Sequence, residues 1–412
     1  MTPDTPILIV GAGTFGLSTA YRLAKAGYKN ITVLEKSPVI PSDLSAGNDL
    51  NKILRAEYED PYYAELALQA LAEWKTPLFA PYYHETGYLL GNSAAAPEKS
   101  KKSLAKSLAS ISSHPAFKGK IRPINTRDDI RSVAPVFDGP MGWKGYFNRF
   151  AGYAHAADAM TAVYSACCAF EVDFRLGDGV ESLVFNGAAC VGAKTQSGKE
   201  YRAEIVVLAL GASLGVVLPQ VGRQVTAKAW SVGHVQLTPE EAARLRGIPV
   251  TYARDLGFFF EPDPRTGLLK LCPSGSGYTN FVREGVSVPP ANNDWIPPRD
   301  EEMIRKLLRE TLPALADRPI INKKMCWCAD TADSEYVIDY VPGKNLLVVS
   351  GDSGHAFKML PVIGNWVKEA LEKGKQDIAR WQWKEGQDAS GEVSWRVGKT
   401  VDIKDPAIRS KL

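Results

Sequence analysis

Near its start the chain has a strand, a glycine-rich turn and a helix, and this unit constrains the fold more than any other stretch. Four apolar residues, 7–10, precede the motif Gly11-Ala12-Gly13-Thr14-Phe15-Gly16, and helix-forming residues follow at 17–26. A second apolar run then ends at Glu35. Short apolar runs of this kind are typical of strands buried on both faces of a parallel sheet. The order strand, turn, helix, strand predicts an α/β domain.

The three glycines of this turn have the spacing that a dinucleotide site requires. Gly11 permits the tight turn, Gly13 lets the backbone approach a diphosphate, and Gly16 lets the helix pack against the strand. The diphosphate then lies on the free N–H groups of the helix start. A carboxylate at Glu35 accepts hydrogen bonds from an unphosphorylated ribose. The turn therefore predicts a site for FAD or NAD rather than NADP, with purely structural glycines as the alternative.

Composition and charge narrow the class of protein. The 412 residues are 45% apolar and 23% charged, as in ordinary globular proteins, and the length suits one two-domain enzyme. Lys and Arg number 49 against 46 Asp and Glu, a net charge of +3, without a long basic run. We therefore expect no nucleic-acid partner.

The six cysteines are too few and too unevenly placed for a disulfide framework, which predicts a reducing compartment. Two of them form Cys326-Trp327-Cys328, with a one-residue gap and no second pair nearby in the sequence. Zinc sites usually need two pairs with wider gaps, so no metal is expected.

Targeting signals are limited to the last residues of the sequence. The first residues lack a basic segment followed by an apolar run, so we expect no secretory signal. The most apolar stretch, 205–218, is too short and too interrupted by glycine for a membrane span, so no membrane partner is expected. The sequence ends in Ser410-Lys411-Leu412, which predicts a peroxisomal location through the import receptor, against the alternative of a charged terminus without function.

Two later strands also run into glycine turns. Residues 205–210 lead into Gly211, and residues 345–350 lead into Gly351, with Gly354 close behind and a helical pattern after it. Together with the first turn, they suggest a cofactor held along its whole length, which favours FAD over NAD.

The middle of the chain has patterns of a second domain. Residues 225–237 alternate as in an antiparallel strand, and 257–262 with 267–271 predict a hairpin of the same sheet. Residues 142–155, rich in aromatics and glycine, suit either a substrate cavity or a core strand and turn. The Ser-, Ala- and Lys-rich residues 88–120 predict a solvated helix or flexible segment rather than a site.

Five segments resemble fungal fructosyl amino acid oxidases, the amadoriases. More loosely, the chain is similar to monomeric sarcosine oxidase, saccharopine oxidase and pipecolate oxidase, and the likeness spans about residues 6–384. The segments are Gly11 to Gly16, Ser45 to Lys52, Gly257 to Pro262, Cys326 to Asp333 and Gly351 to Lys358.

The resemblance implies a fold class and a division into domains. The fold is α/β, with a glutathione-reductase-like FAD-binding Rossmann domain and a second α+β substrate domain built on a mixed antiparallel sheet. The FAD domain would comprise 1–85, 150–220 and 325–385, and the substrate domain 86–149 and 221–324. Residues 386–412 would form a C-terminal tail.

The resemblance also assigns the cofactor site. In this family FAD is tethered through its 8α-methyl group to a cysteine, and the spacing back from Asp339 matches Cys326, with Cys328 or a merely buried thiol as alternatives. A thioether there raises the flavin's potential. The expected cofactor-binding residues are Gly11, Gly13, Thr14, Gly16, Glu35, Lys36, Ser45, Gly211, Cys326, Gly351, Gly354 and Lys358.

The resemblance implies roles for four cationic side chains. Lys270 matches the lysine that activates dioxygen, against the alternative of a surface strand lysine, and Lys52 matches a lysine facing the flavin from the other side. Lys358 matches the lysine that pairs with the substrate carboxylate. Arg55 matches the carboxylate-binding arginine of the sarcosine branch. A simple surface role is the alternative for Lys52 and Arg55.

The substrate's far end differs from the amadoriase pattern. Where amadoriases carry a glutamate that grips the sugar, this chain has Ser274, which can form a hydrogen bond but brings no charge. Losing a charged hydrogen bond costs about 1.5–3 kcal/mol. Arg396 loosely matches an arginine that closes the site. Saccharopine would suit the carboxylate-binding set of Lys358, Arg55 and Arg396.

The predicted function is an FAD-dependent oxidase of N-substituted amino acids, most like a fructosyl amino acid oxidase. The C–N bond is oxidised to an imine that hydrolyses, and O₂ is reduced to H₂O₂. The alternatives are an L-saccharopine oxidase or a pipecolate or sarcosine oxidase, and more remotely an NAD-dependent dehydrogenase or a flavin carrier without turnover. The partners would be a small-molecule substrate and O₂, and the protein a monomer.

Overall fold

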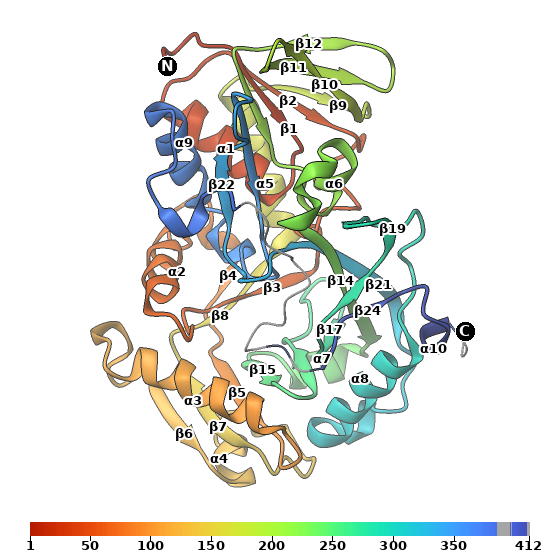
Figure 1. Ribbon diagram of the computed structural model, residues 1–412. Coiled ribbons are helices and arrows are strands. Elements are labelled where there is room, and N and C mark those ends of the chain that lie inside the picture. The colour runs from red at the N-terminus through yellow and green to blue at the C-terminus, as the bar shows by residue number, and fades with distance from the viewer. Residues whose placement is uncertain (385–395, 397, 410–412) are drawn as a thin grey trace.

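The computed structural model describes residues 1–384, 396 and 398–409. It contains two main β-sheets, each built from strands that lie far apart in the sequence (Figure 1). The first sheet has six strands in the order β22-β23-β13-β1-β2-β9. All neighbours pair in parallel except β22, which is antiparallel to β23. Its strands are β1 (Ile7–Val10), β2 (Ile31–Glu35), β9 (Asp173–Leu176), β13 (Ile205–Leu208), β22 (Val337–Tyr340) and β23 (Leu346–Ser350).

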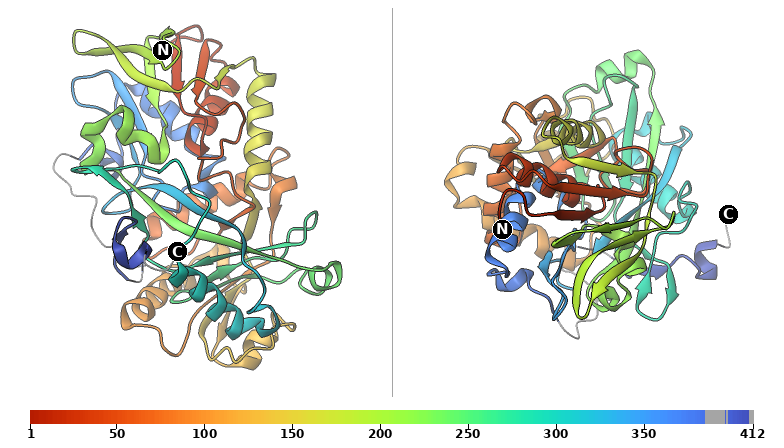
Figure 2. Two further views of the ribbon diagram at one scale, coloured as in Figure 1. Left: turned by 90° about the vertical axis from the view of Figure 1, so that its right-hand side faces the viewer. Right: turned by 90° about the horizontal axis from the view of Figure 1, so that it is seen from above.

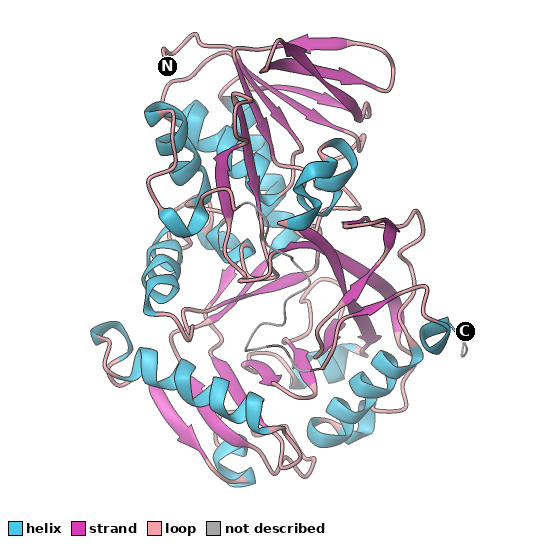
Figure 3. Ribbon diagram, viewed as in Figure 1, coloured by secondary structure: helices cyan, strands magenta, loops and turns pink. Residues whose placement is uncertain are grey.

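Both faces of this sheet are covered, which explains the apolar strand sequences. Ile7 and Ile9 of β1 pack with the helices on one face, whereas Leu8 and Val10 pack on the other. The helices are α1 (Thr14–Lys25), α5 (Ala156–Ala169) and α9 (Ile363–Lys373). The other face is covered by the antiparallel strands β10 (Val180–Asn186), β11 (Ala189–Thr195) and β12 (Glu200–Arg202), and Figure 3 shows these layers.

The second sheet contains ten of the described strands and is mixed. Most neighbours are antiparallel, but β15 pairs in parallel with β5, and β18 with β24. The predicted hairpin is confirmed, because β16 and β17 pair antiparallel with Phe258 opposite Cys272. The strands are β5 (Tyr88–Asn92), β6 (Ile121–Ile124), β7 (Lys144–Asn148), β14 (Thr226–Gln236), β15 (Val250–Ala253), β16 (Gly257–Phe259), β17 (Leu268–Pro273), β18 (Tyr278–Thr279), β21 (Ile321–Asp330) and β24 (Val401–Asp402).

Strand β21 lies against β14 along most of its length, so Cys326 belongs to the second sheet although its segment leads on into the first. The segment predicted as a C-terminal tail contributes β24 to the same sheet. A small sheet of β3 (Asn51–Leu54), β8 (Gly152–His155) and β4 (Tyr83–His84) lies where the two main parts meet, as Figures 1 and 2 show.

The remaining α-helices and strands surround these sheets. They are α2 (Pro61–Glu73), α3 (Glu98–Ser112), α4 (Arg127–Arg131), α6 (Leu214–Val217), α7 (Pro239–Arg244), β19 (Phe281–Arg283), β20 (Val286–Ser287), α8 (Pro298–Thr311) and α10 (Pro406–Arg409). No helix in the described part of the chain combines the length and the apolar character needed to cross a bilayer.

Candidate active site

The glycine turn between β1 and α1 has the geometry of a dinucleotide cradle. Gly11 has a φ of +102°, and a Cβ there would lie 2.5 Å from the carbonyl oxygen of Ala209. A Cβ on Gly16 would lie 1.8 Å from the carbonyl oxygen of Gly11. Gly13 differs, because the nearest atom to its Cβ would be Ser45 Oγ at 3.6 Å. Packing thus explains Gly11 and Gly16, whereas the bare backbone of Gly13 leaves room for a ligand.

The start of α1 and the end of β2 complete this cradle. Gly13 is the N-cap of α1 and supplies no side-chain cap, so the N–H groups of the first turn face the adjoining cavity and suit a diphosphate. Glu35 accepts hydrogen bonds from the N–H groups of Ala12 at 2.9 Å and Ser37 at 3.0 Å. Its carboxylate is thereby fixed beside the turn, where the ribose of a dinucleotide would lie.

Two adjoining cavities lie beside this turn. The smaller, about 240 Å³, is lined by most of the predicted cofactor residues and leads to a larger one of about 670 Å³. Lys52, Cys328, Gly354 and Phe357 line both. The predicted residues in the smaller cavity are Gly11, Gly13, Thr14, Glu35, Lys36, Ser45, Gly211 and Gly354. Of the other predicted cofactor residues, Cys326 and Lys358 line the larger cavity, whereas Gly16 and Gly351 have packing roles.

Lys270 and Lys52 share one carboxylate in the larger cavity. Asp49 Oδ2 lies 2.6 Å from Lys270 Nζ and 2.8 Å from Lys52 Nζ. Lys270 also donates to the carbonyl oxygen of Asn51 at 2.6 Å and is 2% exposed, so it is not the surface strand lysine of the alternative interpretation. Burial alone would raise the pKa of Asp49, but the two ammonium charges hold it well below its usual value.

The two cysteines of β21 face this cavity from the second sheet. Cys326 Sγ lies 3.7 Å from Lys52 Nζ. A hydrogen bond from the Cys328 thiol, together with the Lys52 charge and against the effect of burial, lowers the pKa of Cys326 below its usual value. The same hydrogen bond and burial raise the pKa of Cys328 well above its usual value. Cys326 is therefore the more nucleophilic of the two at neutral pH.

Lys358 and Arg55 lie at the other side of the cavity. Lys358 donates to Tyr58 Oη at 2.8 Å and to the carbonyl oxygen of His355 at 2.6 Å. Burial and the charge of Arg55 hold the pKa of Lys358 well below its usual value. Glu57 is fully buried here, and burial raises its pKa. A carboxylate ligand would favour the charged form of Lys358, so this side of the cavity suits an anion.

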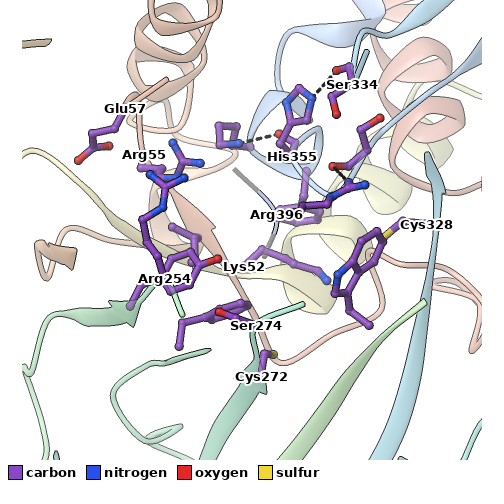
Figure 4. Close-up of a pocket in the computed structure, with 18 of the residues that line it drawn as sticks. Lys52, Arg55, Glu57, Arg254, Cys272, Ser274, Cys328, Ser334, His355 and Arg396 are labelled. Carbon is purple, nitrogen blue, oxygen red and sulfur yellow. Dashed lines mark hydrogen bonds between the residues drawn. The ribbon is translucent and has the colours of Figure 1, made fainter. Parts of the chain in front are cut away.

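Figure 4 shows Arg55 and Arg254 on one side of the cavity and Arg396 and Cys328 on the other. Arg396 donates two hydrogen bonds of 2.6 Å to Asp330. These hydrogen bonds hold the Arg396 guanidinium against Asp330, and its contact with a substrate stays a prediction. Ser274 lines the cavity, and its buried hydroxyl has no hydrogen-bond partner among the described residues.

Several lining residues were missed by the sequence analysis. Asp49 lies between Ser45 and Lys52, in one of the segments that carry the family resemblance. The two lysines that it pairs with come from different strands. Glu57, Tyr58 and Arg254 carry no motif. Residues 88–120, predicted to be a solvated helix or flexible segment rather than a site, were wrongly interpreted in this respect, since Tyr88, Leu90, Lys106 and Ser107 line the larger cavity.

No group of three or more His, Cys, Asp or Glu within residues 1–384, 396 and 398–409 is arranged to hold a metal ion. The predicted peroxisomal signal, Ser410-Lys411-Leu412, lies outside the described residues.

Comparisons with known proteins agree with this architecture. Residues 6–370 match the family model described as FAD dependent oxidoreductase. The chain is 34% identical to L-saccharopine oxidase of Schizosaccharomyces pombe, covering 97% of this chain and 98% of that protein. It is 24% identical to monomeric sarcosine oxidase of Bacillus sp., covering 92% and 95%. Its structure matches fructosamine oxidase (Amadoriase II) of Aspergillus fumigatus in complex with FSA, with a TM-score of 0.90, 37% identity and coverage of 98% and 97%.

Proposed function

The chain belongs to the FAD dependent oxidoreductase family, and from this premise we propose that it oxidises the carbon–nitrogen bond of N-substituted amino acids with dioxygen as acceptor. The observation that carries the proposal is the larger cavity, which adjoins the dinucleotide cradle and brings Lys358 and Arg55 together with the buried Lys270. The family's cofactor is FAD, so the alternative of an NAD-dependent dehydrogenase is set aside.

The residues present fit FAD. The backbone at Gly13 leaves room for a diphosphate, Glu35 lies where a ribose hydroxyl would bind, and the cradle opens into the larger cavity. FAD, when bound, would accept a hydride from the carbon beside the substrate nitrogen and later pass two electrons to dioxygen.

The protein's own groups position and stabilise the reactants. Lys358 and Arg55 bind the amino-acid carboxylate and hold the neutral amine in the cavity. Lys270 supplies a fixed positive charge where negative charge develops on dioxygen. The amine loses a hydride and its N–H proton to give a C=N bond, water hydrolyses the imine, and O₂ takes two electrons and two protons to give H₂O₂.

A panel of substrates tests this function. The purified protein is given fructosyl-valine, ε-fructosyl-lysine, saccharopine, pipecolate and sarcosine, and peroxide is measured in a coupled assay. We expect peroxide from at least one of them and none from unsubstituted valine. If no N-substituted amino acid yields peroxide while the protein contains flavin, the proposal is wrong.

Two of these substrate classes have specific support. Fructosyl amino acids are supported by the structural match to fructosamine oxidase. L-Saccharopine is supported by the relative from Schizosaccharomyces pombe and by Ser274, whose uncharged hydroxyl stands where a sugar-gripping carboxylate is expected from the resemblance. Peroxide from saccharopine but not from the fructosyl substrates would select the second class.

We also propose that FAD is attached covalently through Cys326. Its lowered pKa and its contact with Lys52 support a thiolate at this position, and Cys328 is the fallback. Acid precipitation of the wild type should give a yellow pellet. Cys326→Ala should give a colourless pellet, and Cys328→Ala, the matched control, a yellow one. If Cys326→Ala gives a yellow pellet and Cys328→Ala a colourless one, the attachment is at Cys328 instead.

Two further expectations are kept as proposals. Peroxide as a product supports a peroxisomal location, which an N-terminal fluorescent fusion with and without the last three residues would test. The second is that the protein is a monomer, which sedimentation would test.

A further inference from the structure

We infer that Arg254 forms a second carboxylate-binding subsite in the larger cavity, so that the group attached to the substrate nitrogen carries a carboxylate of its own. The inference rests on the proposed function, because it concerns the far end of the substrate in the same site.

Arg254 is placed there by the pairing of β15 with β5. It follows the last residue of β15, and its N–H donates to the carbonyl oxygen of Gly91 at 2.9 Å. Its Nη2 donates to Ser103 Oγ of α3 at 2.5 Å. The side chain lines the larger cavity although Arg254 is 7% exposed. Arginine is rarely buried to this degree unless an anion accompanies it.

Arg254 and Arg55 act on the same part of the cavity. The charges of both arginines lower the pKa of Tyr88 and of Tyr146, although burial dominates and raises both. Figure 4 shows the two guanidinium groups on the same side of the cavity. Arg55 stacks on the Tyr58 ring, with its Cζ 5.0 Å from the ring centroid, while the Lys358 ammonium donates to the Tyr58 hydroxyl.

The carboxylates of this cavity make no direct contact with Arg254, although Glu59 is linked to it through the Ser103 hydroxyl. Most are engaged by other groups: Asp49 by Lys52 and Lys270, Asp60 and Glu335 by Arg380, Asp333 by Lys384, and Glu59 by Ser103 and, at 3.9 Å, by Lys106. Glu57 is the counter-charge beside Arg55. Within the part of the chain that the structure describes, no carboxylate is in ion-pairing distance of Arg254. Glu57 instead acts on Arg55 and Lys358, so the buried Arg254 has no carboxylate of its own in this cavity.

Ser274 adds a hydrogen-bond donor on the same sheet edge. Its N–H donates to the carbonyl oxygen of Leu256 at 3.0 Å, two residues beyond Arg254. The Ser274 hydroxyl is buried without a partner among the described residues. A serine brings no negative charge, so the edge keeps a guanidinium and a free hydroxyl, which together suit a carboxylate.

A ligand that satisfies these groups has two carboxylates. One meets Lys358 and Arg55 as the amino-acid carboxylate, and the second, on the N-substituent, meets Arg254 on the same side of the cavity. This chemistry fits a secondary amine that joins two amino-acid skeletons better than an amine carrying a neutral polyol.

The test compares two kinds of substrate in three proteins. Saccharopine has carboxylates on its N-substituent, whereas ε-fructosyl-lysine has the same lysine skeleton and a neutral substituent. Wild type, Arg254→Met and Arg254→Lys are compared by peroxide release, each normalised to its flavin content. Lys101→Met, which removes an exposed α3 cation paired with Glu98, is the matched control.

We expect wild type to prefer saccharopine, and Arg254→Met to raise its KM by about 10–100-fold with little change in kcat, because a charge-assisted hydrogen bond is lost from binding. The KM for ε-fructosyl-lysine should change less than about threefold, Arg254→Lys should keep part of the affinity, and Lys101→Met should resemble wild type.

The inference is overturned if Arg254→Met changes both substrates equally, or if wild type oxidises only the neutral substrate. The wild-type preference needs no variant, so a poorly folding Arg254→Met still leaves the inference open to refutation. Absence of peroxide from every substrate would instead refute the proposed function.

Discussion

Buried cations differ in how their charges are compensated, and the difference separates their roles. Asp49 compensates Lys52 and Lys270, and Lys52 contacts Cys326 of β21. Lys358 has only neutral acceptors in its hydrogen bonds, from Tyr58 and His355. A cation held by a carboxylate supplies a fixed positive charge, as stabilisation of charge on dioxygen requires, whereas a cation without one gains from an anionic ligand.

Replacing Lys270 by methionine should slow reoxidation of the reduced flavin by dioxygen about 10²–10³-fold, since a preorganised charge is removed from the reacting centre. Reduction by substrate under anaerobic conditions should change far less. Asp49 keeps Lys52 as a partner, so the variant should fold. Stopped-flow absorbance resolves the two half-reactions, and Lys194→Met, an exposed lysine of β11, is the control. If Lys270→Met is reoxidised at the wild-type rate, Lys270 does not have the proposed role with dioxygen.

His355 should make stability fall in mild acid. Burial and the Lys358 charge lower its pKa to about 3, against an ordinary value of 6.5. Below pH 6.5 the unfolded chain binds a proton that the folded protein excludes, so stability is present above 6.5 and is lost as pH falls toward 3. At pH 5 this loss is about 2 kcal/mol, or roughly 2 °C in Tm for a chain of this size.

His355→Gln removes this titration and leaves a side chain able to form hydrogen bonds. We expect its drop in Tm between pH 7 and pH 5 to be smaller than that of wild type, measured by calorimetry in matched buffers. An equal drop in both proteins would mean that His355 is protonated in the folded state as readily as in the unfolded one.

At the scale of elements, the two-residue period of β21 organises the site. Cys326, Cys328 and Asp330 lie on one face of the strand, because alternate side chains point the same way. The cysteines line the larger cavity, and Asp330 joins Lys228 of β14, at 2.9 Å, to Arg396. One strand thus presents the proposed flavin attachment and also fixes the chain near its C-terminal end.

Asp330→Asn should destabilise the protein by about 3–5 kcal/mol, because Lys228 and Arg396 would both stay buried without a carboxylate. Arg396→Met keeps the Lys228–Asp330 pair and should cost clearly less. Thermal unfolding of the flavin-loaded proteins measures both. Equal losses in Tm would show that the ion pair with Lys228 contributes nothing once Arg396 is gone.

The turn before α1 allows a matched pair of glycine variants. Gly16→Ala should prevent normal folding, since its Cβ would lie 1.8 Å from a carbonyl oxygen. Gly13→Ala meets no protein atom closer than 3.6 Å, so it should fold but weaken FAD binding about tenfold or more. Circular dichroism and the flavin content of the purified proteins separate the two effects. A fully loaded Gly13→Ala would show that the cofactor does not approach this backbone.

Local patterns predicted much of this architecture but not the contacts between distant segments. The first turn, the hairpin of β16 and β17 and the glycines that line the smaller cavity follow from short motifs. Arg254 meets Ser103 only because β15 pairs with β5 in a register that places Tyr252 opposite Leu90, and neither segment encodes that pairing by itself.

Helix α3 was misjudged for a related reason. Its buried face carries Ser100, Ser103 and Ser107 beside Leu104, so the face that packs has few apolar residues and the segment resembles a solvated one. Whether such serines meet solvent or buried polar partners depends on the fold around them.

At the scale of the whole molecule, the two cavities lie between the six-stranded sheet and the ten-stranded one. Residues from both parts line them, including Gly354 after β23 and Cys328 on β21. A cofactor bound there contacts both parts, so its binding free energy adds to the stability of the whole fold. The form of this coupling depends on whether the cofactor is attached.

This dependence gives a test that requires no substrate. If FAD is attached through Cys326, the Tm of wild type should not change with added FAD, since no dissociation accompanies unfolding. In Cys326→Ala the cofactor binds reversibly, so each tenfold rise in free FAD above its Kd adds about 1.4 kcal/mol of stability. For a chain of 412 residues this amounts to roughly 1–2 °C in Tm per tenfold step. Calorimetry over a hundredfold range of FAD, with Cys328→Ala as the control that keeps its attachment, measures the difference. A wild-type Tm that rises with FAD as steeply as that of Cys326→Ala would exclude the covalent link while leaving FAD as the cofactor.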